Sequence, residues 1–327
     1  MIFDIVWLVA GLAAILVGAD MLTDGSSAIA KRMGVSDLII GLTVVAFGTS
    51  TPELVISVMS AVNGNDSLAV GNIVGSNILN ILLILGITSL IRPIIIKKSV
   101  MTNEIPMVVL SSLIMLVFGY SATLDGGPED IITRVDGIML LIFFILFMRY
   151  TFASARRKPA GSEKDPASAD GEHLKKVTTL KATVFIIIGL AGLIWGGDRF
   201  VDGASSLARH MGVSEALIGL TIVAIGTSLP ELATSIIAAV KNQPGLAVGN
   251  VIGSNIFNIL LVLGTAATVA PLPFRGVTRV DLWTLMGASI MFLVFARAFR
   301  HRCITRPEGV VMLVAYIAYM AWLVIAQ

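Results

Sequence analysis

The sequence predicts an all-α, polytopic membrane protein with ten transmembrane helices, arranged as two inverted repeats of five helices. Three observations predict this fold: an apolar composition, a long internal repeat, and an uneven distribution of lysine and arginine. Hydrophobic residues make up 56% of the 327 residues and charged residues only 13%, whereas an average soluble domain has about 25% charged residues. The formal net charge of +2 is too small to indicate a protein that binds nucleic acid.

The internal repeat aligns without a gap. Residues 41–86 and 219–264 are identical at 29 of 46 positions. The stretch that ends at Glu53, Val-Ala-Phe-Gly-Thr-Ser-Thr-Pro-Glu, returns as Val-Ala-Ile-Gly-Thr-Ser-Leu-Pro-Glu and ends at Glu231. A repeat of this length predicts that the two halves of the chain form the same structural unit.

Apolar runs predict the individual helices, because a helix that crosses a bilayer needs roughly 20 apolar residues. The first run follows no basic segment and precedes no small-residue cleavage site, so we expect a retained helix and not a signal peptide. Runs that are free of charge, or broken by one acid, lie near residues 5–19, 38–64, 67–91, 105–124, 137–148, 182–197, 216–240, 245–274, 282–296 and 309–327.

The chain divides into a first transmembrane repeat (residues 1–151), a linker (152–179) and a second transmembrane repeat (180–327). The linker is rich in small and charged residues and is too short for a folded domain, so it is expected to be a disordered tether. Polar connections follow the first helix of each repeat. Their acids are expected to cap helices or to be solvated at the membrane edges; they are Asp20, Asp24, Asp198 and Asp202.

Lysine and arginine predict the orientation, because loops rich in these residues stay cytoplasmic. With the amino terminus outside, eighteen basic residues fall in cytoplasmic loops and five fall outside. Both termini are therefore expected outside and the linker in the cytoplasm. Because five spans are an odd number, the second repeat enters from the other side and is inverted, a pattern typical of secondary transporters.

Each repeat has a proline inside its second helix. Pro52 has no N–H, so the carbonyl of Gly48 loses its helical partner, and Pro230 acts in the same way in the second repeat. Free carbonyls at membrane depth are tolerated only where they are buried in protein or line a cavity. A carboxylate in mid-span is costly unless it is used. We therefore expect these helices to open locally and Glu53 and Glu231 to be functional.

Oxygen-bearing side chains share helix faces near these acids. Serines lie three residues before each glutamate, at Ser50 and Ser228, and the pairs Ser76–Asn80 and Ser254–Asn258 are four residues apart. The set contains no histidine or thiol and suits hard cations such as calcium and sodium. Two carboxylates neutralise one divalent ion or two monovalent ions, so competition for a shared site is the expected coupling.

Four further asparagines in the same helices have two open interpretations. They form hydrogen bonds between helices, or they are neighbours of the ion site. They are Asn72, Asn77, Asn250 and Asn255.

The paired Gly-Thr-Ser-x-Pro-Glu and Gly-Ser-Asn-x-x-Asn segments resemble the two alpha repeats of the prokaryotic type of sodium/calcium exchanger family, within the calcium/cation antiporter superfamily. The resemblance covers the chain apart from the linker. It implies that Glu53 and Glu231 bridge a calcium ion, helped by the backbone carbonyls of Thr49 and Thr227. It also implies that the flanking sodium sites are completed by Ser50, Ser76, Asn80, Ser228, Ser254 and Asn258.

The resemblance further implies that the first and sixth helices slide across the rest of the protein to expose the site alternately. Glycines in these helices are compatible with sliding and equally with close packing; they are Gly11, Gly18, Gly189, Gly192 and Gly196. Family members often carry one aspartate at the position of Asn80 or Asn258. Here both are asparagine, which leaves two carboxylates instead of three.

The sequence thus predicts an inner-membrane (plasma-membrane) antiporter that exchanges sodium for calcium by alternating access. Its partners are these ions and the lipid bilayer, with no cofactor, no nucleic acid and no obligatory protein partner. A proton-coupled calcium/cation antiporter on the same scaffold is the main alternative. An intramembrane serine hydrolase lacks a base, since His173, His210 and His301 lie outside the spans. A passive cation channel does not explain an inverted repeat with two broken helices.

Overall fold

The computed structural model describes residues 2–156, 178–211, 224–298 and 303–325, and the chain separates into two compact units. The first unit contains residues 1–49 and 149–250, and the second contains residues 50–148 and 251–327. Each unit therefore takes elements from both sequence repeats. Residues 157–177, which make up most of the predicted linker, lie outside the described residues.

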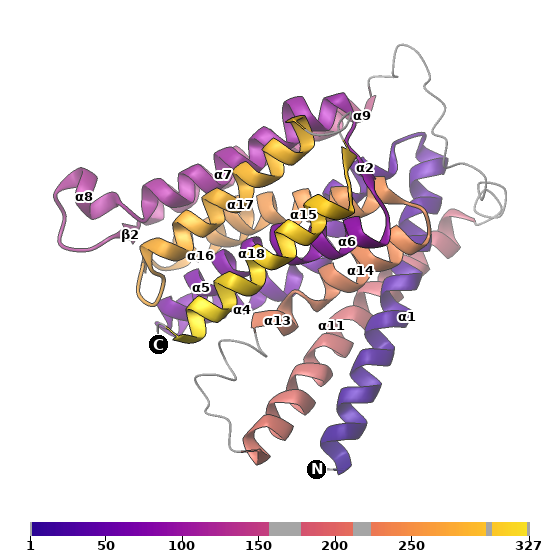
Figure 1. Ribbon diagram of the computed structural model, residues 1–327, viewed down its shortest axis with the longest axis horizontal. Helices are drawn as coiled ribbons and strands as arrows, with labels where there is room; N and C mark the ends of the chain where they lie inside the picture. The colour runs from indigo at the N-terminus through magenta and orange to yellow at the C-terminus, as the bar shows by residue number, and fades with distance from the viewer. Residues whose placement is uncertain (1, 157–177, 212–223, 299–302, 326–327) are drawn as a thin grey trace. The chain divides into compact units, whose positions relative to one another are not determined.

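The first unit is built around two helices of 32 residues, α1 (Ile2–Met33) and α11 (Thr179–His210), which lie side by side (Figure 1). Glycines make this contact close. A Cβ atom on Gly18 would lie 2.7 Å from the carbonyl oxygen of Gly189, and one on Gly189 would lie 2.7 Å from that of Gly18. Gly11 and Gly196 approach each other in the same way. Of the two explanations for these glycines, the structure therefore supports close packing, here of α1 on α11.

The other helices of the first unit are shorter and surround an apolar core. They are α2 (Asp37–Ile40), the π-helix η1 (Gly41–Val45), α3 (Ala46–Thr49), α13 (Ala224–Thr227), α14 (Leu229–Val240) and the first half of α15 (Pro244–Phe257). The core joins α1 to the repeat helices through Ile15, Leu22, Val45, Leu193 and Leu246, each at most 1% exposed.

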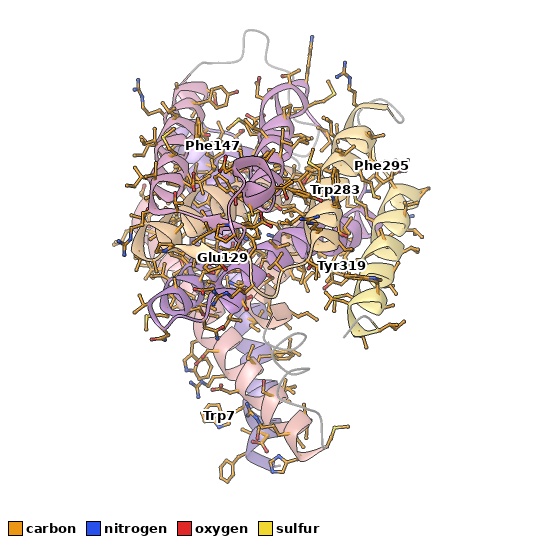
Figure 2. All side chains as sticks on the ribbon, turned by 90° about the vertical axis from the view of Figure 1, so that its left-hand side faces the viewer. Trp7, Glu129, Phe147, Trp283, Phe295 and Tyr319 are labelled. Carbon is orange, nitrogen blue, oxygen red and sulfur yellow. The ribbon has the colours of Figure 1, made fainter. Side chains whose placement is uncertain are left out.

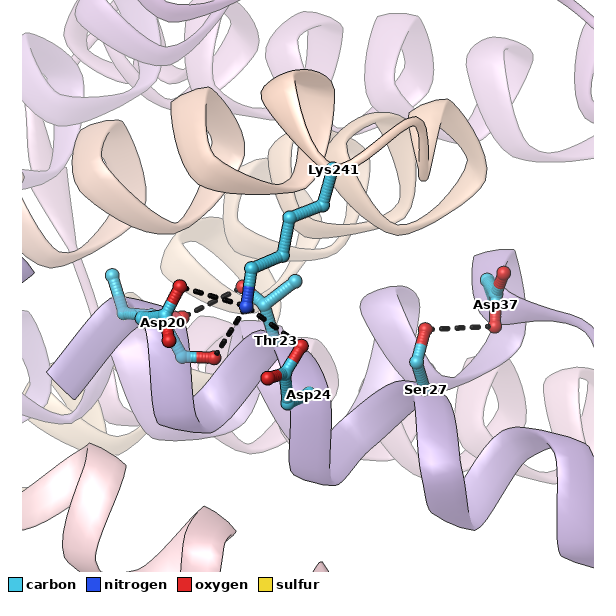
Figure 3. A network of polar contacts seen from close by, with 7 residues as sticks. Asp20, Thr23, Asp24, Ser27, Asp37 and Lys241 are labelled. Atoms are coloured by element: carbon cyan, nitrogen blue, oxygen red, sulfur yellow. Dashed lines mark hydrogen bonds and ion pairs between the residues drawn. The ribbon is translucent and has the colours of Figure 1, made fainter. Parts of the chain in front are cut away.

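Asp20 and Asp24 lie in the interior of α1, so of their two expected roles, capping a helix or being solvated, the first is wrong; their side chains are 54% and 33% exposed. The helix continues to Met33 because its second half still buries apolar side chains such as Leu22. The ammonium group of Lys241, at the C-cap of α14, lies 2.7 Å from a carboxylate oxygen of each aspartate (Figure 3).

The equivalent acids of the second repeat, Asp198 and Asp202, are also internal to a helix, α11. The guanidinium group of Arg199 lies 2.6 Å from Asp198 Oδ2 and 3.3 Å from Asp202 Oδ2. Capping is therefore wrong for these two acids as well, and their side chains are 61% and 57% exposed.

The second unit contains the remaining elements of both repeats, together with the second half of α15. From the first repeat come α4 (Thr51–Val62), α5 (Asp66–Leu79), the π-helix η2 (Asn80–Ile84), α6 (Leu85–Ile91), β1 (Ile94–Ile95), the π-helix η3 (Val100–Glu104), α7 (Ile105–Phe118), α8 (Ser121–Asp125), β2 (Ile131–Ile132) and most of α9 (Arg134–Arg156). The end of α9, from Arg149, belongs to the first unit. From the second come the π-helix η6 (Asn258–Leu263), α16 (Gly264–Val269), β3 (Leu272–Pro273), α17 (Arg279–Ala298), β4 (Cys303–Ile304) and α18 (Arg306–Ile325).

Short strands join the two repeats within the second unit. They were not predicted from the sequence, which indicates an all-α protein. β1 pairs with β4 and β2 pairs with β3, both antiparallel. Each pair thus takes one strand from each repeat. Ile132 and Leu272, which lie opposite each other in the second pair, are both 0% exposed.

Three helices of the second unit begin with the same capping box, Thr-Arg-x-Asp or Thr-Arg-x-Glu. The carboxylate of Asp136 accepts a hydrogen bond from the Thr133 N–H (2.8 Å), Asp281 accepts one from the Thr278 N–H (2.6 Å), and Glu308 accepts one from the Thr305 N–H (2.9 Å). Such a box satisfies an orphan N–H at the first turn. In α17 the acid has a second role, because the Tyr319 hydroxyl (Figure 2) donates to Asp281 Oδ1 at 2.8 Å.

Within the described residues, eight helices are long and apolar enough to cross a membrane, or nine if the broken pair Asp37–Thr49 and Thr51–Val62 is one span. The predicted span 216–240 falls partly outside these residues, and its described part contains the shorter apolar helix α14. Outer faces are apolar: Ile145 of α9 is 59% exposed and Ile317 of α18 is 65% exposed. Such faces require a lipid environment.

Candidate functional site

Both predicted helix breaks are present. α3 ends at Thr49, Ser50 leaves helical geometry (φ −83°, ψ 7°), and α4 begins at Thr51. In the second repeat α13 ends at Thr227, Ser228 has φ −93° and ψ 6°, and α14 begins at Leu229. The prolines fall in the first turns of α4 and α14, where the missing N–H removes no helical hydrogen bond.

The two candidate carboxylates occupy equivalent positions in these broken helices. Glu53 lies in the first turn of α4 and Glu231 in the first turn of α14, and each residue is 0% exposed. The amino-terminal end of a helix stabilises negative charge in its first turn. Complete burial makes a negative charge on either carboxylate costly unless a partner compensates it.

The hydroxyl-bearing candidates are buried as well. They lie at the helix breaks and on α5 and α15, the helices that follow. Their exposed fractions are 0% for Thr49, 3% for Ser50, 2% for Ser76, 6% for Thr227, 1% for Ser228 and 0% for Ser254.

Asn80 and Asn258 begin the π-helices η2 and η6, which directly continue α5 and α15. Both asparagines are 0% exposed, and within the described residues neither amide oxygen nor amide nitrogen of either has a hydrogen-bond partner. Buried polar groups without partners are rare in proteins and need an explanation such as a bound ion. π-Helical turns are frequent at functional sites. No feature of the sequence predicted them.

The ten candidates divide between the two units. The first unit contains Thr49, Thr227, Ser228 and Glu231, and the second contains Ser50, Glu53, Ser76, Asn80, Ser254 and Asn258. Within the second unit, α4, α5 and η6 contact one another in pairs. This packing brings together the helices that carry Glu53, Ser76 and Asn258.

Two equivalent asparagines form the hydrogen bonds between helices that the first of their two interpretations expects. Asn72 Nδ2 of α5 donates to Ser57 Oγ of α4 at 3.1 Å, and Asn250 Nδ2 of α15 donates to Ser235 Oγ of α14 at 3.1 Å. Ser57 and Ser235 are related by the sequence repeat but were not singled out from it. Asn255 Nδ2 donates instead to the Val251 carbonyl of its own helix, at 2.7 Å.

The described residues contain no cluster of three or more histidine, cysteine, aspartate or glutamate side chains that could hold a metal ion. The ligands expected from the sequence are instead two carboxylates and neutral oxygen donors, a set of groups that suits hard cations. Of the three histidines, His210 is an exposed residue at the end of α11, and His173 and His301 lie outside the described residues.

Comparison with known proteins identifies the family. The family model described as sodium/calcium exchanger protein matches residues 3–153 and 181–325. The chain belongs to the sodium/calcium exchanger family. It is 39% identical over 324 residues to the putative antiporter CaxA of Alkalimonas amylolytica, covering 98% of each chain. It is 29% identical to the sodium/calcium exchanger MaX1 of Methanosarcina acetivorans, covering 96% of each chain.

A solved structure of this family has the same fold. The sodium-calcium exchanger NCX_Mj, soaked with 2.5 mM Na+ and 0.1 mM Ca2+, superimposes with a TM-score of 0.83 at 33% identity, covering 98% of each chain. The family match, the relatives and the apolar helices together establish a multi-pass membrane protein and a cation antiporter of the sodium/calcium exchanger family. The predicted resemblance is thereby confirmed.

Proposed function

We propose that this exchanger-family protein couples sodium entry to calcium export through one shared, alternately exposed set of ligands. Calcium would be bound by the carboxylates of Glu53 and Glu231 with the backbone carbonyls of Thr49 and Thr227. Sodium ions would use the surrounding hydroxyl and amide oxygens; these belong to Ser50, Ser76, Asn80, Ser228, Ser254 and Asn258.

The observation that carries the proposal is the pair of buried amides at Asn80 and Asn258, whose oxygens have no hydrogen-bond partner within the described residues. In a sodium-coupled antiporter these amides would serve both calcium and sodium, whereas in a proton-coupled calcium antiporter they would serve calcium alone. A hard cation needs several oxygen ligands at once. Neutral oxygens that are buried in equivalent places in both repeats therefore support cation binding in both repeats, and the uptake experiment below distinguishes sodium from protons as the coupling ion.

The coupling follows from the cost of burying charge. Leaving one carboxylate buried without a partner costs several kcal/mol. A conformational change with Glu53 and Glu231 both uncompensated is therefore strongly disfavoured, whereas two sodium ions or one calcium ion neutralise the pair. Each ion then crosses only when it replaces the other, which is antiport.

The decisive experiment is radioactive calcium uptake into sodium-loaded proteoliposomes, diluted into sodium-free or sodium-matched buffer. We expect uptake only with an outward sodium gradient, and none for Glu231→Gln or Glu53→Gln. Glu129→Gln is a matched control, since Glu129 is 47% exposed and pairs with Arg275 at the surface. Calcium uptake driven by a pH gradient and indifferent to sodium would establish the proton-coupled alternative.

We further propose an inner-membrane location with both termini outside and residues 152–179 in the cytoplasm, from the distribution of lysine and arginine. The predicted inversion of the repeats depends on the same orientation. Cysteines placed singly at Ser162 and near Gln327 test it by labelling intact cells with a membrane-impermeant maleimide. Labelling near Gln327 but not at residue 162 is expected; the reverse pattern would refute the orientation.

A further inference from the structure

We propose that Asn250 is a positioning residue that sets the geometry of two calcium ligands, Thr49 and Glu231. The inference rests on the proposed function and adds to it a residue outside the ligand set. Asn250 is 0% exposed and lies on α15, within the first unit, as do Thr49 and Glu231.

Three hydrogen bonds place the Asn250 amide between the two helix breaks. Its Oδ1 accepts from the Thr49 hydroxyl at 3.1 Å. Its Nδ2 donates to the Glu231 carbonyl oxygen at 3.3 Å and to Ser235 Oγ at 3.1 Å. One side chain thus connects the end of α3, in the first repeat, to the first turn of α14, in the second.

Asn250 holds each ligand residue by a group that the ion does not use. Thr49 would bind calcium through its backbone carbonyl, and Asn250 holds its hydroxyl. Glu231 would bind calcium through its carboxylate, and Asn250 holds its backbone carbonyl. The asparagine can therefore fix both ligand positions without competing for the ion.

The environment makes this arrangement specific. Thr49 and Glu231 are both 0% exposed, so water cannot replace a lost partner at either end. The amide has one possible orientation, because a flip would point Oδ1 at the Glu231 carbonyl oxygen and place two acceptors together. An aspartate or an aliphatic side chain of similar size cannot make the same bonds.

A double-mutant cycle between Asn250→Ala and Thr49→Val tests the proposal, with the half-saturation concentration for calcium binding and the maximum exchange rate as separate readouts. Each single variant loses a buried hydrogen bond and should raise the half-saturation concentration about fivefold or more. The double variant should bind no more weakly than the weaker single variant, because both remove the same connection. Thr49→Ser keeps the hydroxyl and should bind calcium as the wild type does.

Asn255→Ala is the matched control, because it removes a buried asparagine from the same helix whose amide bonds its own helix. Effects that multiply in the double variant, or an Asn255→Ala variant as weak as Asn250→Ala, would overturn the proposal. Thr49→Val replaces one hydroxyl by a methyl group. If Asn250→Ala fails to fold, this variant still tests the hydrogen bond between Thr49 and Asn250. The half-saturation concentration is measured by equilibrium calcium binding, which needs no sodium gradient, so a wild type without sodium-driven exchange would refute the proposed function and leave this test intact.

Discussion

Replacing Lys241 by methionine should loosen the attachment of α14 to α1. The Lys241 ammonium lies 2.7 Å from carboxylate oxygens of both Asp20 and Asp24 (Figure 3). Methionine keeps most of the apolar stem and removes only the charge. The ion pairs connect the end of α14, which carries Glu231, to α1, so the variant reports how firmly these two helices are joined.

The magnitude follows from distance and exposure. Two unit charges 2.7 Å apart attract by about 1.5 kcal/mol in bulk water, but exposed ion pairs contribute only about 0.2–1 kcal/mol when measured. Asp20 is 54% exposed and Asp24 is 33% exposed, so Asp24 should contribute the larger share. We expect a total of about 1 kcal/mol for Lys241→Met, and a fall in Tm of about 1–2 °C.

Thermal unfolding of the purified protein measures this loss. High choline chloride should shrink the difference between wild type and variant, because the Debye length falls to about 3 Å near 1 M salt and choline is not a transported ion. Arg275→Met is the matched control, since its single pair with Glu129 is longer, at 3.3 Å, and more exposed. An unchanged Tm for Lys241→Met, or an equal fall for Arg275→Met, would refute the reasoning.

Three further predictions follow from local packing and chemistry. Gly18→Leu should separate α1 from α11 and lower the stability by about 1–3 kcal/mol or more, seen as a lower Tm, because a Cβ would already lie 2.7 Å from the Gly189 carbonyl oxygen. Asp281→Asn should cost about 1–2 kcal/mol of unfolding free energy by weakening the cap of α17 and the bond to Tyr319; an equal loss in Tyr319→Phe would assign it to that bond alone. Burial and the nearby Glu308 raise the pKa of the Cys303 thiol, so its maleimide labelling should be slower than that of free cysteine at pH 7–8 and should rise at higher pH; equal rates would contradict this.

The sequence predicted the broken helices and their acids well, because the repeat and the prolines carry that information directly. Pro52 and Pro230 stand beside Glu53 and Glu231 in identical surroundings, and chance does not preserve such a stretch. The structure places both breaks at the serine that precedes each new helix, Ser50 and Ser228. The rule that proline, which has no N–H, interrupts a helix was sufficient to predict both breaks.

Helix boundaries were predicted less well, because each apolar run was assumed to stop at the nearest charged residue. The runs expected to begin at residues 137, 282 and 309 start three residues earlier in the structure, at Arg134, Arg279 and Arg306. Each begins with a Thr-Arg-x-acid capping box that was legible in the sequence. The charged residues that we placed outside the apolar runs are in fact the first residues of these helices.

The hydrogen bonds between helices could not be predicted from spacing alone. Asn250 and Asn255 are the same residue type on one helix, yet the first bonds α14 and the second bonds its own backbone. Spacing along a helix gives the face on which a side chain lies but not the neighbour it meets. The role of Asn250 depends on tertiary packing, which places Thr49 and Glu231 on either side of one amide.

The proposed ligand set is the same in both repeats: threonine, serine, glutamate, serine and asparagine recur at each of the five related positions. If the repeats are inverted, as predicted, the ligands alone would favour neither of two alternately exposed conformations, because exchanging the repeats would restore the same set. Any preference must then come from residues that differ between the repeats. Lys241, which binds Asp20 and Asp24, is related by the repeat to Asn63, an uncharged residue. This difference between the repeats lies outside the proposed ligand set, where it can bias the conformational equilibrium without altering which ions are bound.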